Sequence, residues 1–577
     1  MNQTQTLHPV ERCLLRAVSA WLLAVTAVDL LPLTSGLLTT ALMTVTCFIA
    51  FSVVPSLFHR TTPDVPILIG TLLVTAFTHV AQNSDFYFCL TVLVCLLLVG
   101  GILFANGRLS KTAPNLSWRA TKRWIAGLAV LLFVFLAGLT ALRYLQYYSP
   151  NFDFGIFSNM FHHMREDLSQ TVSCERDAVI SHFDVHISPI YYLMLPFYAV
   201  FPSPVTLLVV QAALIACGVI PLCKLAKKRG VRPFLILLLA VAYLAYPAFS
   251  GGCFYDLHEN KFLPLLLLST VCCYESGHFP LTFLFAGLTL LVKEDAPVYV
   301  AVLGLYLALD RRDWKRGAAL FLGAVAYFIF ALTLLESFGT GAMTWRYENI
   351  SKDGLIGVLT AVFTEPMRVM AECLTAEKLV FVLQMLLPLL FLPLITKRPA
   401  RLILLIPLIL VNLMTDYQYQ YSVRFQYTYG SGALLFYAAV LNLADLPEHI
   451  GYQSLCGAAM ASLLLFTSVD LPYTWLVPSY LQNAETRETI DDALTLIPAD
   501  ASVAADTFLV AHLAKRDLIF EYPSKNETEY LVFDLRFGED AAKARKLASA
   551  ERKGYQLLTK TENVIAVYRR AEPEVQP

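Results

Sequence analysis

Charged residues are scarce in this sequence. Of 577 residues only 15% are Asp, Glu, Lys or Arg, whereas 57% are hydrophobic, and the mean hydropathy is +0.59. A water-soluble protein of this length needs more charge to cover its surface. The formal net charge is −1, so no overall basic field points to nucleic acid. The composition therefore predicts an integral membrane protein.

Cysteine pairs with metal-ligand spacing are also missing. The twelve cysteines mostly lie inside apolar runs, for example Cys47, Cys89, Cys95, Cys217 and Cys272, where they are typical of small lipid-facing or core-facing residues. The first apolar run lacks a small-residue cleavage site and is followed by further apolar runs. We therefore expect it to be a retained helix and not a signal peptide.

Long apolar runs, by contrast, are abundant. A helix needs about 20 apolar residues to cross the hydrocarbon core, and this criterion predicts an α-helical polytopic protein with about 13–15 spans. We expect N-terminal transmembrane helices at 1–123, a transmembrane core with outer loops at 124–470 and a separate domain at 484–577. The candidate spans lie near residues 13–32, 36–57, 65–82, 86–105, 124–146, 203–223, 233–250, 261–275, 279–293, 296–309, 316–336, 379–396, 401–415, 428–444 and 453–470.

Lysine and arginine in short loops indicate the orientation of the predicted bundle. Four basic clusters fall on one side, which the positive-inside rule assigns to the cytoplasm; they lie at 108–123, 224–232, 311–316 and 397–401. The N-terminus is then inside and the C-terminal tail outside. The remaining loops face outward and hold almost every unusual polar residue; they are 147–202, 251–260, 293–295, 337–378 and 416–427.

The first outer loop contains an isolated carboxylate followed by a helical pattern. Asp153 precedes apolar residues that recur at helical spacing from Phe157 to Leu168, a pattern typical of an amphipathic helix lying in the membrane interface. Asp153 could cap that helix. Alternatively, it could act at the membrane surface as a base or a metal ligand.

Histidines and further charges gather in the other outer segments. His182, Asp184 and His186 alternate, so in an extended strand they would share one face, which suits metal binding; the alternative is a solvated loop. Asp256 and His258 crowd into a short turn between two apolar helices, where charges usually mark a function, although an ordinary exposed turn is the alternative.

Three consecutive charges interrupt a long apolar stretch at Lys293, Glu294 and Asp295. A turn does not require them, so we expect Lys293 to neutralise a phosphate and one of the acids to orient it or to exchange protons. Tyrosines between Tyr417 and Tyr429 are typical membrane anchors. Arg424, a lone cation among these aromatics, is suited to a phosphate or sugar ligand.

The tail alternates helical and strand patterns. A helix near RETIDDALTLI, a strand at ASVAAD, a second helix, short strands at LIF and EYLVFDL, a charged helix and a closing hairpin predict a small α/β domain. It contains no P-loop, GxSxG or zinc spacing, so binding or shielding is the expected role.

Several of these segments together resemble a DUF family of bacterial predicted membrane proteins related to the glycosyltransferase-C (GT-C) superfamily. The segments are FDFGIF, HFDVHISPIYYLMLPFYAVFPSPVTLLVVQA, YPAFSGGCFYDLH and LVKEDAPVYV, and IPADASVAAD in the tail is also similar. The resemblance implies a GT-C-like bundle in the bacterial plasma membrane, with Asp153 at the position of the catalytic acid.

Two differences from the family pattern affect the expected chemistry. Ser158 and Asn159 stand where the family usually has Asp-Gln, and Phe154 follows Asp153 where characterised relatives have a second acid. Asp153 acting alone is therefore favoured over a two-carboxylate metal site, although a divalent metal stays open as a cofactor.

The resemblance implies transfer of a sugar from a polyprenyl-phosphate donor to an envelope acceptor at the outer face. Asp153 would deprotonate the acceptor, and Lys293 or Arg424 would hold the phosphate. His182, His186, Asp256 and His258 would line the cleft. A lipid or solute transporter is the main alternative, although mid-span charges are few and no repeat is evident. A non-catalytic envelope scaffold would leave the outer acids unexplained.

Overall fold

The computed structural model describes residues 7–31, 36–57, 64–339, 341 and 343–571. Residues 1–6 of the predicted N-terminal part (1–123) and residues 572–577 of the predicted C-terminal domain (484–577) lie outside the described residues. Seven of the described helices are long and apolar enough to cross a membrane, or up to nine if each of two bent pairs counts as one span. The prediction of a multi-pass helical membrane protein is thus confirmed. The seven are α1 (Pro9–Leu30), α3 (Asp64–Gln82), α4 (Phe86–Ala105), α5 (Trp118–Leu145), α8 (Pro204–Cys217) continued by α9 (Val219–Lys228), α15 (Trp314–Ser337) and α20 (Glu448–Val469).

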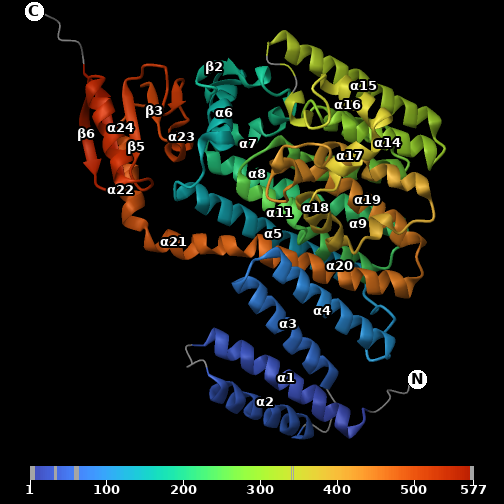
Figure 1. Ribbon diagram of the computed structural model, residues 1–577. Helices are drawn as coiled ribbons and strands as arrows, with labels where there is room; N and C mark the ends of the chain where they lie inside the picture. Colours follow the sequence, from blue (N-terminus) through green and yellow to red (C-terminus); the bar gives the residue numbers. More distant parts are fainter. Residues whose placement is uncertain (1–6, 32–35, 58–63, 340, 342, 572–577) are drawn as a thin grey trace, which may run out of the picture.

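Shorter helices complete the bundle. Helices α12 and α19 are almost entirely buried at its centre, while α1–α4 lie apart from the rest beneath α20 in Figure 1. The Cys89 thiol of α4 contacts the Leu464 carbonyl of α20 at 3.6 Å, which joins the two parts. The other helices of the bundle are α2 (Leu37–Leu57), α10 (Pro233–Leu244), α11 (Pro247–Ser250), α12 (Leu263–Glu275), α13 (Phe279–Leu290), α14 (Pro297–Leu309), α18 (Ala376–Leu386) and α19 (Tyr429–Asp445).

The predicted spans at 379–396 and 401–415 are not continuous α-helices. Helix α18 gives way to the 3₁₀ turns η7 (Leu387–Leu389) and η8 (Leu392–Leu394), and the chain continues through η9 (Pro399–Leu405) and the π-helix η10 (Leu408–Leu413). Prolines cause these interruptions because each lacks an N–H and clashes with the preceding turn. The prediction of a continuous helix at 379–396 and another at 401–415 is therefore wrong.

The first long loop is a folded layer on one end of the bundle. It contains η1 (Asn151–Gly155), α6 (Ile156–Asp167), β1 (Thr171–Glu175), β2 (Ala178–Ser181), η2 (His182–Asp184), η3 (Pro189–Leu193) and α7 (Leu195–Val200). The apolar face of α6 is buried, and Phe161 packs on the rings of Tyr191 and Tyr198. The prediction that this helix lies in the membrane interface is wrong because its apolar face finds protein partners.

A second long loop carries two short helices that meet at 107°, α16 (Gly354–Thr364) and α17 (Pro366–Cys373). The turn η6 (Thr344–Tyr347) precedes them, and η11 (Gln418–Tyr421) and η12 (Gln426–Thr428) lie in the loop before α19. Ile356, Phe363 and Met367 are strongly exposed on this bent pair, which suits contact with lipid.

The tail forms the predicted α/β domain, and each predicted element is present. The chain reaches it through η13 (Leu471–Trp475), α21 (Leu476–Gln482) and α22 (Ala484–Thr495). Its five strands have the order β4-β3-β5-β7-β6, and β3 pairs in parallel with both β4 and β5. Figure 1 shows this domain beside α6 and β2. Its elements are β3 (Val503–Ala505), α23 (Thr507–Leu513), β4 (Ile519–Glu521), β5 (Tyr530–Asp534), α24 (Asp540–Arg552), β6 (Tyr555–Thr561) and β7 (Ile565–Arg570).

Helices α14 and α15 approach each other through two glycines. A Cβ atom at Gly304 would lie 2.7 Å from the Gly317 carbonyl oxygen, and one at Gly317 would lie 2.7 Å from that of Gly304. Small residues allow such close backbone contact in membranes, where van der Waals packing between helices replaces the hydrophobic effect.

Gly317→Val should therefore destabilise the protein by about 1–3 kcal/mol, because the new side chain meets backbone that cannot move aside. Gly323→Val in the same helix is the matched control, since nothing lies within 4 Å of a Cβ there. Thermal unfolding in detergent should show a lower melting temperature for Gly317→Val alone. Equal shifts for both variants would contradict the close α14–α15 contact.

Candidate active site

Asp153 faces a histidine from a distant loop. It lies in η1, which follows α5 after a short connection at 146–150, and its side chain retains 22% exposure. Its Oδ2 is 3.1 Å from Nε2 of His258, and the Tyr255 hydroxyl also donates to this carboxylate. Neither η1 nor α6 has a side-chain hydrogen bond at its N-terminal cap. The geometry therefore does not support the capping interpretation of Asp153.

Behind Asp153 runs a chain of buried charges. His258 Nδ1 lies 3.5 Å from Glu259 Oε2, and Glu259 Oε1 lies 2.9 Å from the Lys293 ammonium. The Tyr191 hydroxyl donates to Glu259 at 2.6 Å. The side chains of His258, Glu259 and Lys293 are at most 5% exposed. Negative and positive groups alternate along the chain, so each buried charge has an opposite neighbour.

This pairing sets the protonation of the four groups. Burial alone would raise the pKa of Asp153 and lower that of His258, but their mutual attraction reverses both shifts: the pKa of Asp153 is lowered and that of His258 is raised. Burial likewise opposes charge on the other two, yet their pairing takes the pKa of Glu259 well below its usual value and raises the pKa of Lys293. Asp153 is thus an ionised carboxylate that is still open to solvent.

The two acids after Lys293 have different environments. Glu294 accepts from His186 Nδ1 at 2.8 Å and from the Ile187 amide at 3.2 Å. Despite burial, His186 lowers the pKa of Glu294. Burial raises the pKa of Asp295 to about 6, and its Oδ1 has no hydrogen-bond partner in the described part of the chain. Asp295 is therefore the acid of this pair that is free to meet a ligand.

Asp256 and Lys261 have structural partners. Arg143 at the end of α5 contacts Asp256 at 2.6 Å, Ser149 donates to it at 3.2 Å, and Lys261 donates to its backbone carbonyl. Burial raises the pKa of Asp256 to about 6. Its φ of 102° is strained for a non-glycine residue. Asp256 thus fixes the sharp turn that presents His258.

The predicted strand with His182, Asp184 and His186 on one face is wrong. Residues 182–184 form the 3₁₀ turn η2, because the chain must turn from β2 back to the bundle. His182 is buried against Glu175 at 3.0 Å, whereas His186 pairs with Glu294. Within the described residues, no group of three His, Cys, Asp or Glu side chains is arranged to hold a metal ion.

Arg346 is a site residue that the sequence-based interpretation missed. It lies in η6, with its guanidinium 4.6 Å from the centre of the Tyr417 ring and 5.3 Å from that of Tyr427. One guanidinium N–H group donates to the Met343 sulfur, but Nε has no hydrogen-bond partner among the described residues. A lone arginine in the TWRYEN segment between aromatics was the available indication, the same pattern that singled out Arg424.

A cavity of about 230 Å³ connects these groups to the apolar helices. Its lining combines His186, Lys293, Glu294, Asp295 and Arg346 with apolar residues of α14, α15, α16 and η10. The cavity is therefore amphipathic. Its apolar lining residues are Val298, Phe328, Leu332, Leu355, Val358, Leu410 and Val411.

A row of aromatic rings joins Arg346 to Asp153. The row runs from Tyr417 through Tyr419 and Phe425 to Tyr255, with neighbouring centroids 4.4–4.9 Å apart, and Tyr255 donates to Asp153. These four rings are partly exposed. The predicted anchoring tyrosines thus include part of the site wall. Arg424 is exposed and interacts with Tyr473, away from the residues that line the cavity.

Comparison with known families matches residues 143–564 to the model described as "Predicted membrane protein (DUF2079)". The chain belongs to this DUF2079 family. The resemblance seen in the sequence motifs is thereby confirmed, and the match includes both the bundle with the Asp153 site and most of the α/β domain. A comparison with curated protein sequences gave no match.

Among solved structures, the DUF2079 chain is similar to apo ArnT from Cupriavidus metallidurans. The alignment covers 76% of this chain and 97% of that one, with 12% sequence identity and a TM-score of 0.43. At this level the likeness decides neither substrate nor mechanism.

The charged state of His258 should make the stability of this DUF2079 protein depend on pH. Because its pKa is raised above the ordinary 6.5, the stabilisation is complete below that pH and is lost as pH rises through the folded-state value. The melting temperature in detergent should therefore fall as the pH rises above about 6.5, and should fall less for His258→Gln. Equal slopes would contradict the pairing of His258 with the two acids.

Breaking the charge chain at Lys293 should be costly. Lys293→Met leaves Glu259 buried with its nearest cation removed, and the expected loss is about 3 kcal/mol of unfolding free energy. The double variant Lys293→Met/Glu259→Gln should recover stability because the unpaired charge is gone. Chemical denaturation of the three proteins in detergent measures this, and a double variant less stable than Lys293→Met would contradict the ion pair.

Proposed function

We propose that this protein is a membrane glycosyltransferase that moves a sugar from a polyprenyl-phosphate donor to an envelope acceptor. The observation that carries the proposal is an ionised, partly exposed Asp153 held by a buried charge chain that reaches an amphipathic cavity. A transferase with a lipid-linked donor needs both features: a membrane-side pocket for the lipid phosphate and a water-side base for the acceptor.

The site is proposed to lie at the non-cytoplasmic face. Contacts between the basic clusters support this, because Arg232 donates to Asn115 and to Glu448, while Arg229 and Arg311 both pair with Glu275. Three of the four clusters, 108–123, 224–232 and 311–316, thus meet at one end of the bundle, and the positive-inside rule assigns that end to the cytoplasm. Asp153 lies beyond the opposite end of α5, so the α/β domain beside it would be extracytoplasmic.

The donor lipid is proposed to occupy the cavity. Its phosphate would lie against Arg346, whose Nε is unpaired and whose planar guanidinium suits phosphate oxygens. Lys293 is committed to Glu259 and would act through its charge. The isoprenoid chain would leave along Val298, Phe328 and Leu332, towards the lipid. Arg346 takes over the role that the sequence suggested for Arg424.

Asp153 is proposed as the general base. As the acceptor oxygen bonds to the anomeric carbon, its O–H becomes acidic, and the proton moves to the Asp153 carboxylate. The bond from that carbon to the phosphate oxygen breaks, and the phosphate leaves with both electrons, stabilised by Arg346. Attack on the face opposite the leaving group inverts the anomeric centre. The rings of Tyr255 and Tyr419 offer flat apolar surfaces for the C–H faces of a sugar.

Asp153→Asn should lower the transfer rate by about 10²- to 10⁴-fold because the amide cannot accept the proton. Membranes containing wild type or variant would be assayed with a panel of labelled polyprenyl-phosphate sugars. Asp167→Asn is the matched control, an exposed acid in the same loop whose amide oxygen can still accept from Ser169. Full transfer by Asp153→Asn would remove this residue from the mechanism.

Arg346→Ala should raise the KM for the lipid donor by about 10- to 100-fold, the equivalent of one lost charge-assisted hydrogen bond. Lys352→Ala, which removes an exposed cation from the same loop, should leave KM unchanged. The measurement is the dependence of transfer on donor concentration in mixed micelles. An unchanged KM for Arg346→Ala together with a raised KM for Arg424→Ala would show that Arg424, as the sequence suggested, binds the phosphate.

A further inference from the structure

The α/β domain presents the edge of its sheet where such sheets commonly bind ligands. The connection from β3 runs through α23 to β4, whereas the connection from its other neighbour, β5, runs through α24 to β6 at the opposite edge of the sheet. The two connections therefore leave the carboxyl ends of β3 and β5 in opposite directions. In open α/β sheets, this switch point forms the ligand crevice. In this protein it is filled by residues 146–151, the segment that leads from α5 to Asp153.

Three side chains at this edge hold the segment. The Thr507 hydroxyl, after β3, accepts from the Asn151 amide N–H at 3.0 Å. Glu521, at the end of β4, accepts from the Asn151 side chain at 2.8 Å. Arg536, just after β5, donates to the backbone carbonyls of Gln146 and Tyr147 at 3.0 and 2.8 Å. All three parallel strands therefore grip one segment, and Asn151 is only two residues from Asp153.

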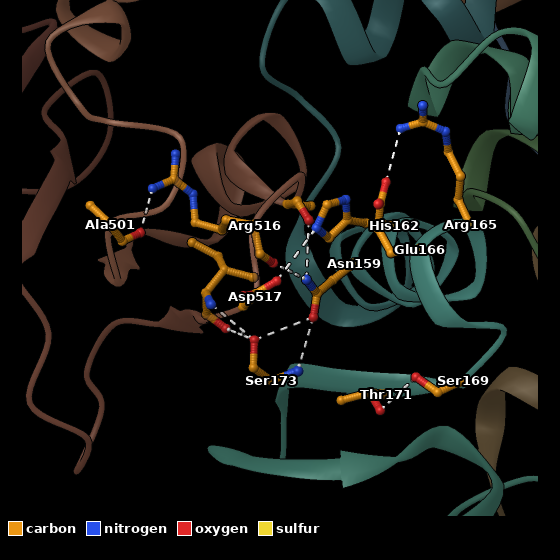
Figure 2. A network of polar contacts seen from close by, with 12 residues as sticks. Asn159, His162, Arg165, Glu166, Ser169, Thr171, Ser173, Ala501, Arg516 and Asp517 are labelled. Carbon is orange, nitrogen blue, oxygen red and sulfur yellow. Dashed lines mark hydrogen bonds and ion pairs between the residues drawn. The ribbon is translucent and has the colours of Figure 1, made fainter.

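A second set of contacts fixes the helix that follows Asp153. Asn159 of α6 donates to the carbonyls of Ala514 and Arg516 at 3.1 and 2.9 Å and accepts from the Ser173 amide at 2.9 Å. The Ser173 hydroxyl in turn exchanges hydrogen bonds with the backbone of Ile519. Figure 2 shows Asn159 and Ser173 pointing into this junction between the loop and the domain. Asn159 and Ser173 are fully buried.

Packing at the junction leaves little room for movement. A Cβ at Gly155 would lie 3.0 Å from Val510 of α23 and still closer to Asn151. The His512 ring stacks against Tyr144 and Tyr147, with centroids 4.1 and 3.8 Å away. Burial lowers the pKa of His512 to about 3, so the ring is neutral at physiological pH. The η1 turn is thus held on both sides of Asp153.

We propose that the α/β domain is a working part of the Asp153 site, and that Asn151, Asn159 and Thr507 are positioning residues that hold Asp153 against His258. The crevice at the sheet edge of the α/β domain binds residues 146–151 of the same chain in place of a separate ligand. The proposal rests on the proposed function for its catalytic consequence, but its structural consequence can be measured separately. A domain that merely shields the bundle would not need hydrogen bonds to the residues on both sides of Asp153.

The test uses the full-length protein in detergent and two changes at one position. Thr507→Val keeps the shape but removes the acceptor for the Asn151 N–H, whereas Thr507→Ser retains it. Asp177→Ala is the control, because it removes contacts with Ser524 and Asn526 at the rim of the same junction but away from Asp153. Amide hydrogen exchange of residues 150–157 is measured by mass spectrometry, and transfer is measured with the donor panel.

In Thr507→Val, the amide hydrogens of residues 150–157 should exchange at least tenfold faster than in wild type. In Thr507→Ser and Asp177→Ala, the exchange rate of this segment should equal that of wild type. The same variant should lose about tenfold in kcat with KM unchanged, since a small displacement of a catalytic group slows the chemical step. An exchange rate of residues 150–157 in Thr507→Val equal to that of wild type would overturn the proposal. So would a loss of kcat in Asp177→Ala as large as that in Thr507→Val. If wild type transfers no sugar, the proposed function fails, while the exchange measurement still decides whether the domain holds the loop.

Discussion

The pairing of Glu259 with Lys293 and His258 is the interaction on which the site depends. All three side chains are buried at the edge of a membrane bundle, where an unpaired charge would strongly destabilise the fold. Each therefore needs an opposite neighbour at a fixed distance. Because the members come from two separate loops and Asp153 from a third, the chain of charges also ties these loops together, and the position of Asp153 follows from it.

The surrounding architecture supplies what the charge chain cannot. The strained turn at Asp256, anchored by Arg143, directs His258 toward Asp153. The sheet edge of the α/β domain fixes the other side of the η1 turn through Asn151. The cavity beside Lys293 and Arg346 adds apolar side chains to these charges. The proposed transfer from a lipid-linked donor depends on this arrangement, a fixed carboxylate tied by a buried charge chain to an amphipathic cavity.

Much of this could be predicted from local patterns. Apolar runs gave the membrane class, and period-two and helical patterns gave every element of the α/β domain, because these depend on residues close in sequence. His258, Lys293 and Glu294 were selected as candidates because charge inside apolar sequence is costly, whereas Asp153 was selected through the family resemblance. Their contact partners could not be predicted, because 104 positions lie between Asp153 and His258 in the sequence and no local rule predicts that contact. Asn159 appeared only as a departure from the family pattern, whereas it is a buried link to the domain.

A cryo-EM structure of the full-length protein in nanodiscs with added polyprenyl phosphate would test the central claim most directly. The account predicts phosphate density within hydrogen-bonding distance of Arg346, with the isoprenoid chain along α14, α15 and α16 and an open aqueous path from the phosphate to Asp153. Lipid phosphate bound at the larger cavity between α3, α4 and α20, or beside Arg424, with the Arg346 pocket empty, would contradict it.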